Sequence, residues 1–260
     1  MVNQTVRPAS YAPLEMEILR LTDPKSEHRT SVSWDGSDQS QPRPLRMAVE
    51  KALLWTNGQT LLVKFLDGSE DNREKVKKAA QIWEKHAHIQ FKFVDAGPSD
   101  IRISFDECGG SFSYVGTEAR SVPDNSATMN LAIANMKSQM IERHILHELG
   151  HTLGCIHEHC SPAAEIPWNK EHVYSYFKGL GWNKEMVDEN LFREYTPEVT
   201  EFSLFDSMSI MMYSLETGFT KDGYTAHFGW DLSKTDKEFI SRVYPKPKKS
   251  QVSSSDRVED

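Results

Sequence analysis

Residues 147–159, with the sequence HELGHTLGCIHEH, hold four of the ten histidines of the chain. His147 and His151 are four residues apart, so on an α-helix their rings project from the same side, one turn apart. Gly154 stands where the end of a helix favours a left-handed residue, and a chain that reverses there can bring His157 back toward the other rings. We therefore predict a helix over residues 138–154 that helps to present three imidazole rings to one point.

Three imidazoles in this arrangement predict a zinc site. Two histidine nitrogens one helical turn apart can bind one tetrahedral zinc ion, whose Zn–N bonds are about 2.0–2.1 Å long. With His147, His151 and His157 as ligands, a fourth position is left for water, which is typical of catalytic zinc. Glu148 follows the first ligand and can direct its carboxylate at that water without binding the metal. The alternative, a solvated helix rich in histidine, requires the whole pattern to arise by chance.

The overall composition is that of a folded protein and argues against several kinds of partner. Hydrophobic residues make up 38% and charged residues 26% of the 260 residues, enough for one sizeable domain. The net charge of −8, with no run of Lys or Arg, argues against a nucleic-acid partner. No apolar run approaches the roughly 18 residues that would span a bilayer. We expect a monomer with no nucleic-acid or membrane partner.

The two ends of the chain differ from its middle. Residues 1–50, rich in Pro, Ser, Asp and Gln, are predicted to be an N-terminal extension, either an inhibitory prosegment or an arm packed on the surface. Residues 246–260 are polar and predicted to be a disordered tail. The first residues lack a secretory signal, which leaves two readings: an intracellular protein, or a secreted one whose leader lies outside this sequence. Residues 51–245 are the predicted catalytic domain.

The pattern of apolar residues in this middle part predicts an α+β fold. Strands are expected over residues 89–97 and 100–106, where apolar and polar residues alternate, and over 60–68, which runs into a turn at Asp67 and Gly68. Residues 127–133 are a further strand candidate. Helices are expected over residues 71–87, 138–154 and 234–244, with shorter ones starting near Asn169 and Asn183. Ser138 and Ser233 are the predicted N-caps of the second and the last of the long helices. This order places the central helix on a twisted sheet.

The chain contains three cysteines, Cys108, Cys155 and Cys160. The odd number leaves at least one thiol unpaired. Cys155 and Cys160 lie on either side of His157 and are close enough in sequence to form a disulfide. We expect small buried or half-buried thiols instead of a bridge.

The histidine pattern resembles a known protease signature. HExxHxxGxxH, residues 147–157, is similar to the zinc signature of the metzincin metalloproteases, and the segment HEHCSPAAEIPWN (157–169) resembles the astacin-like family in its bacterial and fungal branch. FDSMSIMMY (205–213) is similar to the methionine turn of that family, which makes Met211 the turn methionine and Tyr213 its tyrosine. The resemblance implies a mostly parallel sheet with an antiparallel edge strand, packed on a zinc-binding helix and followed by an irregular half that ends in a helix.

The resemblance also implies an activity on peptide or protein substrates. A zinc endopeptidase would use zinc-activated water with Glu148 as general base, and Tyr213 would help to stabilise the oxyanion. An extended substrate is expected to pair with an edge strand, for which Ser113 and Tyr114 in the stretch GGSFSYVG (109–116) are the candidates. An ordinary surface hairpin is the alternative for that stretch.

Two other functions stay open. One is a zinc-containing domain that binds peptides without turnover, and the other is a hydrolase of a non-peptide amide. Glu148 argues against the first, because a binding domain has no need of a general base.

Overall fold

The computed structural model describes residues 48–247 except 109, 199 and 203–204. Most of the predicted extension and of the predicted tail therefore lies outside the described residues. Strand β1 (Ala48–Glu50) pairs antiparallel with β7 (Thr200–Phe202), and the side chains of Ala48 and Val49 are fully buried. β1 therefore lies just before the predicted start of the catalytic domain, because this short apolar stretch finds a strand partner about 150 residues away.

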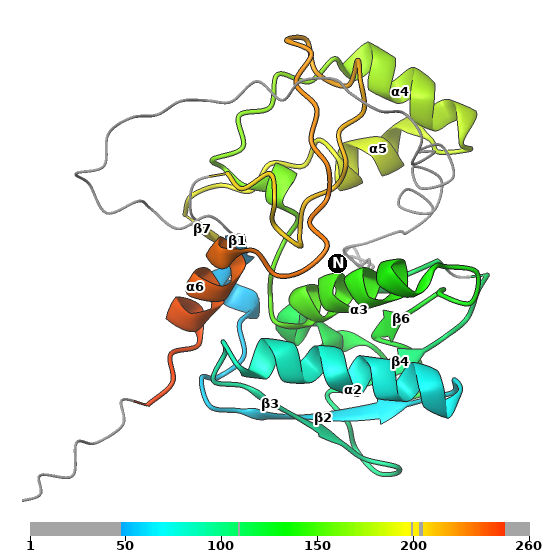
Figure 1. The fold of residues 1–260 in the computed structure, drawn as a ribbon, viewed down its shortest axis with the longest axis vertical. Helices are drawn as coiled ribbons and strands as arrows, with labels where there is room; N and C mark the ends of the chain where they lie inside the picture. The colour runs from blue at the N-terminus through cyan, green and yellow to red at the C-terminus, as the bar shows by residue number, and fades with distance from the viewer. Residues whose placement is uncertain (1–47, 109, 199, 203–204, 248–260) are drawn as a thin grey trace, which may run out of the picture.

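A five-stranded sheet forms the lower half of the molecule in Figure 1. Its strands, in chain order, are β2 (Thr60–Phe65), β3 (Gln90–Phe93), β4 (Ile101–Ser104), β5 (Phe112–Ser113) and β6 (Met129–Asn130). In space the order is β3-β2-β4-β6-β5, and all neighbours are parallel except β5, which pairs antiparallel with β6 at the edge. The mostly parallel sheet with an antiparallel edge strand is confirmed.

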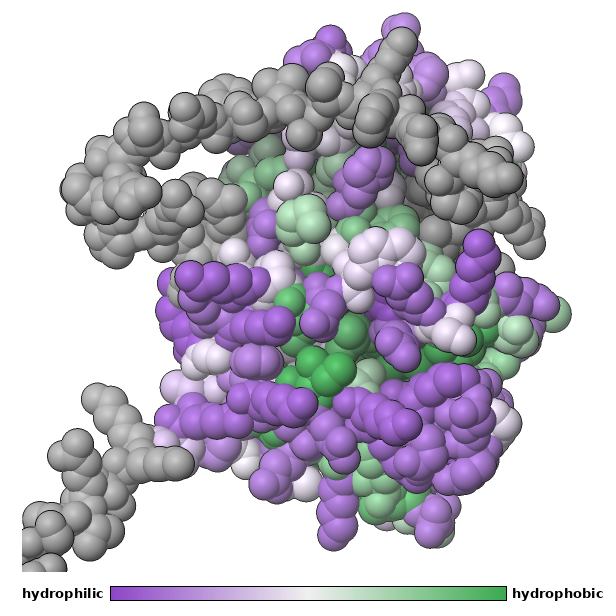
Figure 2. Space-filling model, viewed as in Figure 1, coloured by the Kyte–Doolittle hydropathy of each residue, from purple (hydrophilic) through white to green (hydrophobic). Residues whose placement is uncertain are grey.

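Helices α2 (Glu70–Glu84) and α3 (Ser138–Thr152) run side by side next to this sheet (Figure 1). The indole of Trp83 on α2 is fully buried and donates a hydrogen bond of 3.0 Å to the Leu146 carbonyl on α3, which joins the two helices. The opposite side of α2 is hydrophilic, as Figure 2 shows, and carries ion pairs such as Lys77–Glu74. One amphipathic helix therefore supports the central one.

The start of α3 differs from the prediction. Ser138 is the first residue of the helix, and Lys137 is the N-cap, with no side-chain hydrogen bond to the helix. The prediction of Ser138 as the cap is therefore wrong. From Met140 to Thr152 every residue of α3 except Glu142 is buried, so tertiary packing rather than capping stabilises this helix.

The C-terminal half is mostly irregular and forms the upper part of Figure 1. It contains α4 (Lys170–Gly179) and α5 (Lys184–Asn190), and its own apolar cluster includes Phe177, Phe219 and Tyr213. The last helix, α6 (Lys234–Val243), begins at a capping box in which Ser233 and Asp236 exchange hydrogen bonds, as the prediction of a Ser233 cap requires. Within the described residues, no helix has the length and apolar character to cross a bilayer.

Candidate metal centre

Three predicted ligands meet at one point. The Nε2 atom of His151 lies 3.1 Å from Nε2 of His147 and 3.1 Å from Nε2 of His157. All three side chains are buried. In a tetrahedral zinc site with bonds of about 2.0–2.1 Å, neighbouring nitrogen ligands are roughly 3.3 Å apart, so this spacing fits a single zinc ion.

Hydrogen bonds to two backbone carbonyls define which nitrogen of each ring faces the centre. His147 Nδ1 is 2.8 Å from the Ile210 carbonyl oxygen, and His151 Nδ1 is 2.8 Å from the Cys155 carbonyl oxygen. Because a carbonyl only accepts hydrogen bonds, each Nδ1 carries the proton and each Nε2 keeps a lone pair. Two lone pairs at 3.1 Å repel each other unless a cation lies between them. The donor set therefore fits a metal ion.

The end of α3 positions His151 and reverses the chain toward His157. The Thr152 carbonyl accepts a 2.7 Å hydrogen bond from the Trp55 indole, and the Leu153 carbonyl accepts one of 2.8 Å from the Tyr244 hydroxyl. These donors satisfy carbonyls that the end of a helix leaves without partners. Gly154 then adopts the predicted left-handed conformation, with a φ of +95°.

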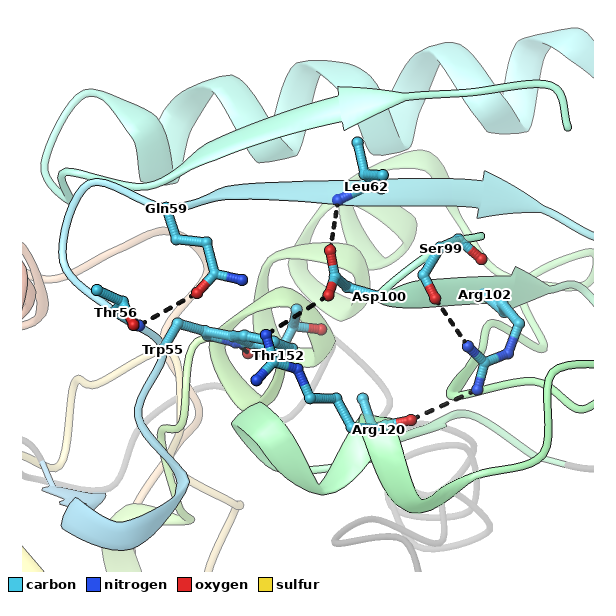
Figure 3. Close-up of polar contacts among 10 residues, drawn as sticks. Trp55, Thr56, Gln59, Leu62, Ser99, Asp100, Arg102, Arg120 and Thr152 are labelled. Carbon is cyan, nitrogen blue, oxygen red and sulfur yellow. Dashed lines mark hydrogen bonds and ion pairs between the residues drawn. The ribbon is translucent and has the colours of Figure 1, made fainter. Parts of the chain in front are cut away.

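The environment of Trp55 further fixes this end of the helix. In Figure 3 the Arg120 side chain extends toward Trp55 and Asp100, with its guanidinium 4.9 Å from the centroid of the indole and 3.8 Å from the Asp100 carboxylate. Asp100 in turn accepts a 2.9 Å hydrogen bond from the backbone of Leu62 in β2. The helix that carries two of the three histidines is thus connected to the central sheet.

The predicted methionine turn lies against the same helix. Met211 is fully buried, and a Cβ added at Gly150 would come within 2.5 Å of its sulfur atom. The thioether therefore packs on the bare backbone of α3, between His147 and His151 in the chain. The same turn supplies the Ile210 carbonyl that accepts from His147.

The Tyr213 ring lies among the histidines. Its centroid is 4.2 Å from that of His157 and 5.9 Å from that of His147, and the residue is only 2% exposed. The His159 ring stacks on the same group, with its centroid 5.1 Å from that of Tyr213 and 5.3 Å from that of His157. Burial lowers the pKa of His159 to about 4, so its ring is neutral near pH 7 and donates from Nε2 to the Asn190 carbonyl. His159 therefore has a packing role.

The remaining predicted site residues are Glu148, Ser113 and Tyr114. Glu148 is fully buried on α3, beside His147 in the chain. The Ser113 hydroxyl is buried and lies 3.2 Å from that of Thr152, so this side chain faces α3 and not the outside of the sheet. Tyr114 is half-buried, next to Phe112. The Ser113 side chain is therefore turned toward α3, whereas the rings of Phe112 in β5 and of Tyr114 after it are partly exposed.

The contacts of several groups at the centre do not follow from the sequence. The Ile210 and Cys155 carbonyls are backbone groups, so no residue type marks them. Glu158 is fully buried, and its carboxylate accepts a 2.6 Å hydrogen bond from the Asp206 backbone, which fixes the segment that leads into the methionine turn. Asp236 was predicted only as part of a helix and not as a neighbour of that turn.

The cysteines are all free thiols, with Cys108 exposed and Cys155 and Cys160 buried. The expectation that Cys155 and Cys160 are not bridged is confirmed. Burial raises the pKa of the Cys160 thiol to about 12 and that of the Cys155 thiol well above its usual range. Both therefore stay protonated near neutral pH and act as small apolar side chains.

The sequence is similar to that of one known metalloproteinase. Zinc metalloproteinase nas-38 of Caenorhabditis elegans is 28% identical over 157 residues, which are 59% of this chain and 19% of that protein. The chain thus spans about a fifth of the length of this relative.

Solved structures give a closer match. A structure of myroilysin superposes with a TM-score of 0.75 at 41% sequence identity and covers 77% of this chain and 99% of that chain. A crystal structure of myroilysin gives a TM-score of 0.58 at 40% identity, over 75% and 87% of the two chains. Placement in a bacterial and fungal branch stays a prediction.

The sequence model of the family described as Astacin (Peptidase family M12A) matches residues 48–228, from β1 through the histidines and the methionine turn. This range covers most of the chain and includes the three histidines, Glu148, Met211 and Tyr213. With it, the α+β metzincin fold and zinc as the cofactor are confirmed. The chain belongs to the astacin family of zinc metallopeptidases.

Proposed function

We propose that this protein is a zinc endopeptidase that cleaves peptide or protein substrates, with His147, His151 and His157 as the zinc ligands. The convergence of three Nε2 atoms, with 3.1 Å separations around His151, is the observation that carries the proposal. Zinc supplies Lewis acidity, which lowers the pKa of water and polarises a carbonyl group. Three protein ligands leave one position open, as catalytic sites require.

Glu148 acts as the general base. It accepts a proton from the attacking water and returns that proton to the leaving amine of the cleaved peptide. Its position on α3 directly after His147 supports this role, because the same helical turn then carries a ligand and the base.

Tyr213 donates a hydrogen bond to the oxyanion that forms at the substrate carbonyl. The support is the position of its ring, 4.2 Å from that of His157 between centroids, in a site that excludes most water. A phenol in such a place can stabilise developing negative charge without reorganising solvent.

The substrate pairs as an extended strand with β5. This strand is the outer member of the sheet, and among the described residues no further strand lies beyond it. Its connection to α3 through Ser113 and Thr152 would place a bound peptide next to the zinc-binding helix. Backbone pairing of this kind recognises a chain direction and is compatible with many sequences.

The test is cleavage of a diverse peptide mixture, analysed by mass spectrometry. We expect internal cleavages by the zinc-loaded protein, loss of cleavage with a chelator, and loss of cleavage in Glu148→Ala with zinc still bound. A protein that binds zinc fully and cleaves no peptide would contradict the proposal and favour a peptide-binding domain. If the protein cleaves non-peptide amides but no peptide, the result would favour the alternative of a hydrolase that acts on a non-peptide amide.

A further inference from the structure

Asp236, in the first turn of α6, has a fully buried side chain with partners on two separate segments. Within its own helix, Oδ2 accepts a 2.9 Å hydrogen bond from the Ser233 backbone and completes the capping box. The same oxygen accepts one of 2.8 Å from the Ile210 backbone, and Oδ1 accepts one of 2.8 Å from the Ser209 hydroxyl. Two of these three donors therefore belong to the methionine turn and not to α6.

Capping alone does not account for this arrangement. A capping box needs one oxygen of a side chain that can remain in solvent. Burial of a carboxylate is costly unless hydrogen bonds compensate for the lost water. At Asp236 burial raises the pKa to about 6, while the three donors act in the opposite direction. The buried carboxylate is thus matched to the backbone of the methionine turn.

The contacts continue from Asp236 to a proposed zinc ligand through a single residue. The N–H of Ile210 donates to Asp236, and the carbonyl of Ile210 accepts from His147 Nδ1 at 2.8 Å. Ser209, which donates to the same carboxylate, also accepts a 3.0 Å hydrogen bond from the Met211 backbone. Hydrogen bonds to the Asp236 carboxylate therefore fix the orientation of the peptide groups on both sides of Ile210.

We infer that Asp236 is a positioning residue for the metal centre: it holds the methionine turn so that the Ile210 carbonyl keeps the proton of His147 on Nδ1 and leaves Nε2 for zinc. The inference rests on the zinc site proposed above. Partners of this kind orient a ligand and set its tautomer, and their removal typically costs about 10- to 100-fold in metal affinity.

The experiment measures the zinc dissociation constant of purified variants by competition with a chromophoric chelator, with far-UV circular dichroism as the check of folding. Asp236→Ala is expected to raise the constant by about 10- to 100-fold. Asp236→Asn is expected to restore most of the affinity, because the amide oxygen can still accept from Ile210. Ser233→Ala is the comparison variant. It removes the other half of the capping box and a hydrogen bond to the Asp206 carboxylate, and it keeps Asp236 as the acceptor for Ser209 and Ile210.

If Asp236→Ala does not fold, Ser209→Ala is compared with Ser233→Ala instead. Ser209→Ala removes the donor to Oδ1 and keeps Asp236 as the cap of α6, so it is expected to weaken zinc binding more than Ser233→Ala does. Wild-type zinc affinity in Asp236→Ala or in Ser209→Ala, or equal weakening in Ser233→Ala, would overturn the inference. Failure of the wild-type protein itself to bind zinc would instead overturn the proposed function.

Discussion

At the scale of single residues, His151 is the centre of the site, because its Nε2 lies 3.1 Å from Nε2 of both other proposed zinc ligands. Its Nδ1 donates to the carbonyl of Cys155, which follows the turn at Gly154. The left-handed conformation of Gly154, with a φ of +95°, strains any residue with a Cβ. The turn that ends α3 therefore has two effects: it returns the chain toward His157, and it fixes the tautomer of His151.

The role of the Tyr213 hydroxyl is tested by Tyr213→Phe. We expect kcat for a peptide substrate to fall by about 10²- to 10³-fold, because one donor to the oxyanion is lost, with little change in KM or in bound zinc. Tyr174→Phe, which removes a hydroxyl that bonds Asp188 outside the metal centre, is the control and should retain activity. Unchanged kcat in Tyr213→Phe would show that the ring only packs against the histidines.

The thiols should differ in reactivity according to their burial. In the native protein at pH 8 we expect iodoacetamide to modify Cys108 alone, because Cys155 and Cys160 are buried and burial raises the pKa of Cys160 to about 12. In denaturant all three should react. Mass spectrometry of peptides from both samples measures this, and native modification of Cys160 at the rate of Cys108 would contradict it.

At the scale of elements, the contact between α3 and the methionine turn depends on a glycine. Gly150→Ala would place a methyl group 2.5 Å from the Met211 sulfur and 3.2 Å from the Trp83 ring. We expect this crowding to lower the free energy of unfolding by about 1–3 kcal/mol, measured by urea denaturation of the zinc-loaded protein.

Gly179→Ala is the matched control for this prediction. Gly179 is the last residue of α4, and a Cβ there would meet nothing within 4 Å. Because alanine favours a helix more than glycine does, we expect a gain in stability of up to about 1 kcal/mol. Equal effects of the two substitutions would show that Met211 does not pack closely on α3.

At the scale of the whole molecule, the methionine turn crosses between two apolar clusters. Met211 belongs to the cluster between the sheet and helices α2, α3 and α6, whereas Met212 and Tyr213 belong to the cluster of the upper half. His147 and His151 lie on α3, and His157 packs against Tyr213. A zinc ion held by these three residues therefore links the two halves.

Zinc removal should consequently destabilise the entire domain. At a free zinc concentration 1,000 times the dissociation constant, binding stabilises a folded protein by about 4 kcal/mol, which corresponds to roughly 8–16 °C in Tm for a domain of this size. We expect a chelator to lower Tm by such an amount in scanning fluorimetry, and added zinc to restore it. His157→Ala should start at the lower Tm and respond little to the chelator.

The sequence by itself determined the helices, the four parallel strands of the sheet and the residue types of the centre, but not the short strands β1 and β7. The spacing of His147 and His151 places both rings on one side of a helix, and Gly154 marks its end, because both effects act within a few residues of the chain. For the same reason the starts of α5 and α6 follow from the capping side chains of Asn183 and Ser233, whereas α4 begins after Asn169 without a side-chain cap.

Only the tertiary structure decided how the ligands are held. His147 donates to a carbonyl 63 residues away, and the Ile210 backbone donates to Asp236, 26 residues further along the chain. A backbone carbonyl carries no signature in the sequence, and a buried aspartate in a capping box looks the same as an exposed one. Ser138 misleads for the same physical reason, since packing on all sides, and not a local cap, stabilises α3.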